Sequence, residues 1–137
     1  MSLDFDINPI AVIVATVACT LLGGLYFTVV VAKPYAAVMG RENEPAWQPP
    51  ASAFAGQFVS TLLVVLTSSV LLNSLRITEI GTGLLFGLVV GVGHLAAQTL
   101  NIAINPNFPH PFRYTAINAP YFIACSVITG AIVTALA

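Results

Sequence analysis

Residues 80–104 read IGTGLLFGLVVGVGHLAAQTLNIAI and contain no Asp, Glu, Lys or Arg. A bilayer core of about 30 Å is crossed by roughly 20 apolar residues in an α-helix. The stretch therefore predicts a membrane-spanning helix. Its glycine, histidine and amide residues recur at intervals of three or four, as positions on one face of a helix do.

Three further stretches of similar length also lack charged residues, at residues 9–31, 51–75 and 114–137. Helices satisfy their backbone polar groups internally, as segments in lipid must. We therefore expect an all-α fold, an integral membrane four-helix transmembrane bundle, with residues 1–137 as a single domain. The expected loops are residues 32–50, 76–79 and 105–113. The short loop at 76–79 predicts that the second and third helices are antiparallel neighbours, and Asn8 before Pro9 is typical of a helix start.

The composition agrees with a membrane protein, because 58% of the residues are hydrophobic and only 7% are charged, against about a quarter in soluble domains. The net charge is −1 and no basic run exists, which argues against a nucleic-acid partner. The expected partner is the lipid bilayer of the cell (inner) membrane. Lys33, Arg41 and Arg113 lie in the two long loops, and Arg76 lies in the short one. The positive-inside rule then predicts cytoplasmic long loops and both termini outside the cytoplasm.

One face of the third helix begins with small residues and ends with polar ones. Its members are Gly83, Gly87, Gly91, His94, Gln98, Asn101 and Asn105. Glycines at this spacing let another helix approach closely, whereas an imidazole and several amides are costly against lipid. We expect this face to turn toward protein or water.

The other helices offer faces that can meet it. Thr20 and Gly24 lie one turn apart on the first helix, and Gly130 lies on the fourth. We expect these residues to pack helices, together with Gly83, Gly87 and Gly91. This is more close-packing surface than one small bundle readily uses, so we expect a homo-oligomer, most simply a dimer.

Asn118 and Tyr121 lie one turn apart near the start of the fourth helix. Either they cap the chain around Pro120 or they contact a ligand. Path-lining or ligand-binding candidates are therefore His94, Gln98, Asn101, Asn118 and Tyr121.

Two functions fit these patterns. One is a small channel or transporter with a polar path along the third helix. The other is a non-catalytic structural or accessory membrane protein whose polar residues only hold helices together through interhelical hydrogen bonds. The sequence does not indicate a small-molecule ligand or substrate for either function.

We expect no enzyme activity, no catalytic residue and no cofactor. The acids Glu42, Glu44 and Glu79 lie in or beside loops, away from the serines of the second helix, so no hydrolytic triad can be assembled. A metal or heme at His94 would need a second ligand. The only other histidine, His110, lies in the third loop, so we expect no metal site within the chain.

Residues 23–35, GGLYFTVVVAKPY, and residues 117–121, INAPY, together resemble a bacterial and fungal membrane family, the domain of unknown function 1761. Tyr26, Lys33 and Tyr35 match the family's first pattern of glycine, aromatic, lysine and aromatic residues. Three residues depart from this pattern. Leu25 stands where the family usually has tryptophan, Thr28 where it has proline and Ala32 where it has glycine. Pro120 stands where the second pattern usually has glycine. The resemblance implies four spans and no known activity.

Overall fold

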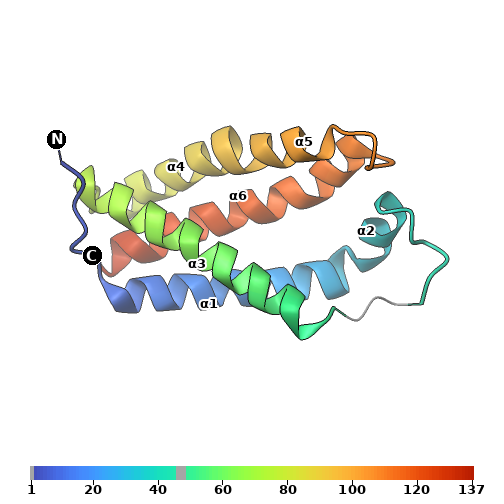
Figure 1. Ribbon diagram of the computed structural model, residues 1–137. Coiled ribbons are helices and arrows are strands. Elements are labelled where there is room, and N and C mark those ends of the chain that lie inside the picture. Colours follow the sequence, from blue (N-terminus) through green and yellow to red (C-terminus); the bar gives the residue numbers. More distant parts are fainter. Residues whose placement is uncertain (1, 46–48) are drawn as a thin grey trace.

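The computed structural model describes residues 2–45 and 49–137, and this part of the chain folds mainly as helices (Figure 1). In chain order the elements are α1 (Pro9–Leu25), the π-helix η1 (Tyr26–Val30), α2 (Ala32–Val38), α3 (Ala51–Ser74), α4 (Ile80–Val90), the π-helix η2 (Gly91–Ala96), α5 (Ala97–Ala103) and α6 (Pro111–Ala135).

Four apolar helical runs within the described residues are long enough to cross a membrane. These first to fourth spans are Pro9–Val30, Ala51–Ser74, Ile80–Ala103 and Pro111–Ala135. The expected all-α fold with four membrane-spanning helices is confirmed, and the chain has the character of a multi-pass membrane protein.

The expected first loop was wrong over part of its length. Residues 32–50 were predicted as loop, but Ala32–Val38 form α2. The fourth span also starts before residue 114, at Pro111, because proline suits the first turn of a helix, where its missing N–H is not needed. Residues 46–48 of the predicted loop lie outside the described residues.

The start of α1 follows the sequence prediction. The Asn8 side-chain oxygen accepts hydrogen bonds from the backbone N–H groups of Ile10 at 2.9 Å and Ala11 at 3.4 Å, with Pro9 at the first helical position. The Asn8 side-chain amide also donates to the carbonyl of Leu136 at 2.7 Å. The predicted N-cap is confirmed, and it joins the start of α1 to the end of α6.

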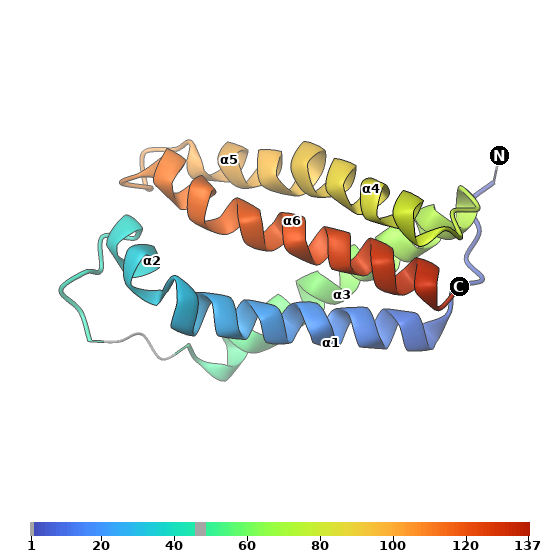
Figure 2. The ribbon, with the colours of Figure 1, turned by 180° about the vertical axis from the view of Figure 1, so that it is seen from behind.

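The fourth span, α6, is the central element of the bundle. It contacts α1, α2, α3, α4, η2 and α5. In Figures 1 and 2 the third span runs along one side of α6, and α1 runs along the other. The two chain ends lie at one end of the bundle, and α2 lies at the opposite end.

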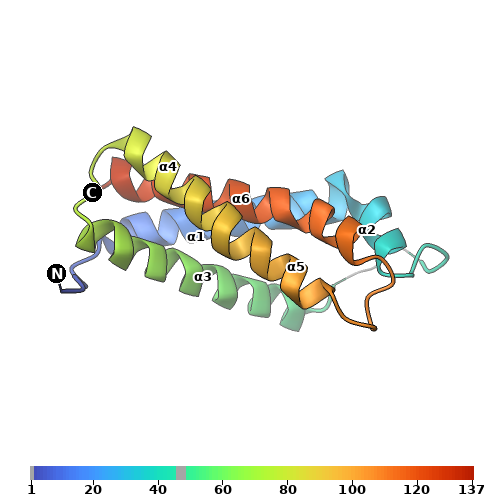
Figure 3. The ribbon, with the colours of Figure 1, turned by 90° about the horizontal axis from the view of Figure 1, so that it is seen from above.

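The second and third spans are joined by a short connection but do not pack extensively on each other. The second span, α3, packs on α1 and α6, whereas the third span packs on α6. Figure 3 shows the two spans running at an angle to each other. The predicted antiparallel direction of the two spans is seen in Figure 1. The predicted neighbour contact is largely missing, because the glycines of the third span pack on α6 instead.

Candidate functional site

The third span changes its helical geometry at its middle. Its first part is the α-helix Ile80–Val90, and the π-helix Gly91–Ala96 follows. A π-turn closes its hydrogen bond one residue later than an α-turn does. Each residue beyond it is therefore displaced around the helix by about one position, or roughly 100°.

This displacement divides the expected face in two. Gly83, Gly87 and Gly91 are buried, but beyond the π-helix the buried positions are Thr99 and Ala103. His94, Gln98 and Asn101 are exposed. The prediction that the glycines and the polar residues share one helix face was wrong, because it assumed an uninterrupted α-helix.

We call these three exposed polar residues the polar face. Their side chains make few hydrogen bonds within the chain. The Asn101 amide donates to the Gln98 side-chain oxygen at 3.5 Å. The His94 imidazole makes no hydrogen bond within residues 2–45 and 49–137, although the His94 backbone carbonyl accepts one from Ala97. The imidazole is therefore free to meet a group from outside the described chain.

Two small residues lie beside the polar face and are also exposed. Gly93 precedes His94, Ala97 precedes Gln98, and the two small residues are four positions apart. No atom lies within 4 Å of where a Gly93 side chain would begin. Small residues at this spacing let a second helix approach closely in a membrane, so the outer side of the third span has the shape of a helix contact.

The glycines of the first part of this span lie in the interface with α6. A side-chain carbon on Gly83 would lie 2.6 Å from the Gly130 carbonyl oxygen, and one on Gly87 would lie 2.6 Å from the Cα of Val127. A side-chain carbon on Gly91 would lie 2.9 Å from the Cα of Ile123. The absence of side chains at these glycines allows backbone-to-backbone contact between the third and fourth spans.

On α1 the glycine in close contact with other helices is Gly23, one residue before the predicted Gly24. Thr20 is partly buried, and its hydroxyl donates to the Thr16 carbonyl of its own helix at 2.7 Å. Nothing lies within 4 Å of a side-chain carbon built on Gly24, whereas one on Gly23 would meet the Gln57 amide and lie 2.7 Å from the Tyr121 hydroxyl. Within the described residues Gly24 makes no close helix contact, and Gly23 continues the buried face of α1 from Cys19.

Asn118 and Tyr121 are both buried within α6. The Asn118 amide donates to the Tyr114 carbonyl at 2.8 Å, within the first turns of α6. The Tyr121 hydroxyl accepts a hydrogen bond from the Gln57 amide at 3.1 Å and donates to the Cys19 carbonyl at 3.2 Å. These contacts join α6 to α3 and α1, and they do not bring either residue to His94.

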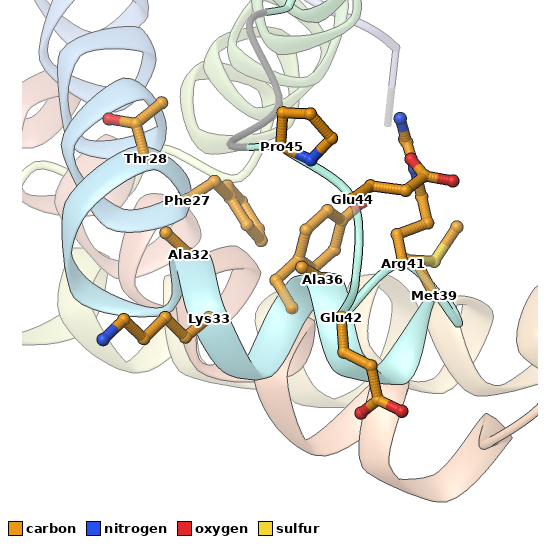
Figure 4. Close-up of a pocket in the computed structure, with 11 residues that line it drawn as sticks. Phe27, Thr28, Ala32, Lys33, Ala36, Met39, Arg41, Glu42, Glu44 and Pro45 are labelled. Carbon is orange, nitrogen blue, oxygen red and sulfur yellow. The ribbon is translucent and has the colours of Figure 1, made fainter.

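A separate cavity of about 460 Å³ opens beside α2 (Figure 4). Phe27, Ala36 and Pro45 face this cavity, while the charged ends of Lys33 and Glu42 turn away from it. The cavity surface is mainly apolar and lies where the first span ends.

Ring contacts support the wall of this cavity. The centroid of the Phe27 ring lies 5.2 Å from that of Tyr35 and 5.2 Å from that of Tyr121. Burial, with a further contribution from Tyr114, raises the pKa of Tyr35 above its ordinary value. The cavity was not predicted, because residues 32–50 were expected to be loop. The aromatic residues within residues 23–35 were the only sequence feature that pointed to this cavity.

Neither region gathers the side chains of a metal centre. Within the described ranges, no three His, Cys, Asp or Glu residues lie together in a way that could hold a metal ion.

A sequence model of a family described as "Protein of unknown function (DUF1761)" matches residues 10–134. The match covers all but the first residue of the first span and the last residue of the fourth, and it confirms the resemblance seen in the sequence. No curated protein and no solved structure matches the chain.

Proposed function

This chain belongs to the DUF1761 family of proteins of unknown function, and we propose that it is a small homo-oligomeric channel or transporter whose polar path runs along the third span. The observation that carries the proposal is the exposure of His94, Gln98 and Asn101 on a span that is otherwise apolar.

The depth of His94 makes its exposure important. It lies fourteen residues after Ile80 and nine before Ala103, or roughly 20 Å and 14 Å along a helix that rises about 1.5 Å per residue. The imidazole therefore belongs near the middle of the hydrocarbon. Polar side chains at such depth face protein or a water-filled space, because lipid offers them no hydrogen bonds.

A second copy of the chain is the simplest partner for the polar face. Imidazole and carboxamide groups each contain donors and acceptors, so this face is complementary to itself. A dimer about a two-fold axis brings identical faces together. Because a single chain leaves the polar face open, a path along the third span forms only between copies.

The chemistry of this path suits small polar solutes. The third span supplies an imidazole and two amides but no carboxylate, lysine or arginine. Such a lining offers hydrogen bonds without a fixed charge, and a neutral histidine can also accept a proton. We propose, from the positive-inside rule, that Asn101 lies toward the cytoplasmic end of the path.

A specific observation favours the alternative function, a structural or accessory protein without transport. Gly93 and Ala97 allow close approach of a second helix, and very close approach leaves no room for a path. In that case His94, Gln98 and Asn101 join the copies by hydrogen bonds alone.

Reconstitution into liposomes distinguishes the two functions. Proton flux is followed with a trapped pH-sensitive dye, and glycerol flux is followed by light scattering after osmotic shock. The channel or transporter proposal expects flux of at least one probe in the wild type. It expects loss of that flux in His94→Leu and retention in Leu85→Ile, whose side chain is also exposed on the third span.

Two results of the same flux assay would contradict the transport proposal. If neither probe moves through wild-type protein that is crosslinked as a dimer in the same vesicles, the path proposal fails and the structural alternative stands. If flux is the same in wild type and His94→Leu, the path does not run along this face.

A further inference from the structure

The two cysteines of the chain face each other between the first and fourth spans. The Cys19 thiol lies 3.5 Å from the Cys125 carbonyl oxygen, and the Cys125 thiol lies 3.9 Å from the Cys19 carbonyl oxygen. Reciprocal contacts of this kind arise when two residues stand directly opposite each other. Both thiols are free.

The pair lies among apolar side chains, with a few hydroxyl and carbonyl oxygens close to the two thiols. Cys19 is fully buried, whereas Cys125 retains 8% of its surface. The remaining polar neighbour of the Cys19 sulfur is the Thr129 hydroxyl at 3.8 Å. Tyr121, Leu22 and Phe122 belong to the same packed cluster.

The position along the helix places the pair deep in the membrane. Cys19 lies ten residues after Pro9 in a span that ends at Val30, or roughly 15 Å from one end and 16 Å from the other. Water-soluble oxidants are excluded from this depth. A lipid-soluble oxidant can enter this depth, and Cys125 is the less deeply buried of the two thiols.

We propose that Cys19 and Cys125 form a dithiol that reduces a lipid-soluble quinone and becomes a disulfide between the first and fourth spans. Two S–H bonds break, and one S–S bond forms. The two protons and two electrons pass to the quinone, one proton to each carbonyl oxygen, and give the quinol. The event occurs once per chain, so it is stoichiometric unless an external reductant restores the thiols.

The geometry supports this pairing over other fates of the thiols. A disulfide joins Cα atoms about 4.4–6.8 Å apart, so it needs two residues that stand opposite each other, as the reciprocal thiol-to-carbonyl contacts of Cys19 and Cys125 indicate. Glutathione disulfide is charged and polar, so it does not enter the hydrocarbon depth at which the pair lies. The pair should therefore react with an oxidant that enters the bilayer and resist glutathione disulfide, which does not.

The test uses the wild-type protein in phosphatidylcholine vesicles with decylubiquinone as the probe. The expected result is a monomer that has lost the mass of two hydrogen atoms, with one quinol formed per chain. Both cysteines should then resist alkylation after denaturation, and dithiothreitol should restore their alkylation. Glutathione disulfide should leave both thiols alkylatable.

Cys19→Ser and Cys125→Ser are the matched controls, since serine is close in size and each variant keeps one thiol. Neither variant should form quinol or lose mass. The proposal is overturned if wild-type thiols stay fully alkylatable after exposure to decylubiquinone. It is also overturned if either single-cysteine variant forms as much quinol as the wild type. The polar face of the third span is not involved, so this result is independent of the transport assay.

Discussion

Gly83 and Gly130 are in backbone contact across the third and fourth spans. A side-chain carbon on Gly83 would lie 2.6 Å from the Gly130 carbonyl oxygen, and one on Gly130 would collide with the Gly83 carbonyl oxygen. Neither carbonyl can move aside as a flexible side chain can. This mutual contact sets how closely the two spans approach.

Gly130→Ala should therefore destabilise the protein by about 1–3 kcal/mol, the usual cost of overpacking. Thermal unfolding in detergent, followed by a dye that reacts with newly exposed Cys19 and Cys125, measures the effect. Gly81→Ala is the control, because nothing lies within 4 Å of the added carbon. Equal melting temperatures for the two variants would contradict the close contact.

Gly23 and Gly24 provide a second matched pair on α1. Gly23→Ala should lower the melting temperature, because the new carbon meets the Gln57 amide and the Tyr121 hydroxyl. Gly24→Ala should leave it unchanged or raise it slightly, since alanine favours helix more than glycine does. The same unfolding assay compares them, and greater damage from Gly24→Ala would reverse our assignment of the buried face.

The number and nature of the spans follow from the sequence because four long uncharged stretches allow few alternatives in lipid. The orientation of His94 does not follow in this way. The glycine and polar positions fit a regular α-helix from Gly83 to Asn101, and no residue in that pattern signals the π-helix at Gly91–Ala96. One additional residue in a turn is enough to separate the buried glycines from the polar face.

The buried contacts of Tyr121 were also beyond the reach of spacing alone. Asn118 and Tyr121 could be placed near one another, but the partners of Tyr121 come from α3 and α1. Gln57 and Cys19 are distant in sequence, and each fits its own apolar stretch without any pattern that joins them. Only the packing of three spans brings these groups together.

Tyr121→Phe should destabilise the bundle by about 1 kcal/mol, because hydrogen bonds between membrane helices average roughly 0.6 kcal/mol each. The variant loses the bond from the Gln57 amide and the bond to the Cys19 carbonyl. A double-mutant cycle with Gln57→Leu measures the shared part. Strictly additive effects of the two substitutions would show that the Gln57 contact contributes nothing.

Arg76→Gly should stabilise the protein by about 0.5–1 kcal/mol, because Arg76 adopts a left-handed conformation that glycine accepts without strain. Its φ is 55°. The N–H groups of Arg76 and Ile77 bond back to the Asn73 and Leu72 carbonyls at 2.9 and 3.0 Å, which closes the end of α3. Thermal unfolding measures the change, and Leu75→Gly, at a position with φ −83°, should instead lose stability. A lower melting temperature for Arg76→Gly would contradict the strain.

The central claim is that the polar face of the third span meets a second copy of the chain. Disulfide crosslinking in native membranes tests it most directly, with a single cysteine at position 98 or 99 and Cys19 and Cys125 both replaced by serine. Gln98 is exposed and Thr99 is buried against the chain's own bundle. We predict a crosslinked dimer for Gln98→Cys and monomer for Thr99→Cys. Monomer alone for Gln98→Cys, or a dimer formed equally at both positions, would contradict the account.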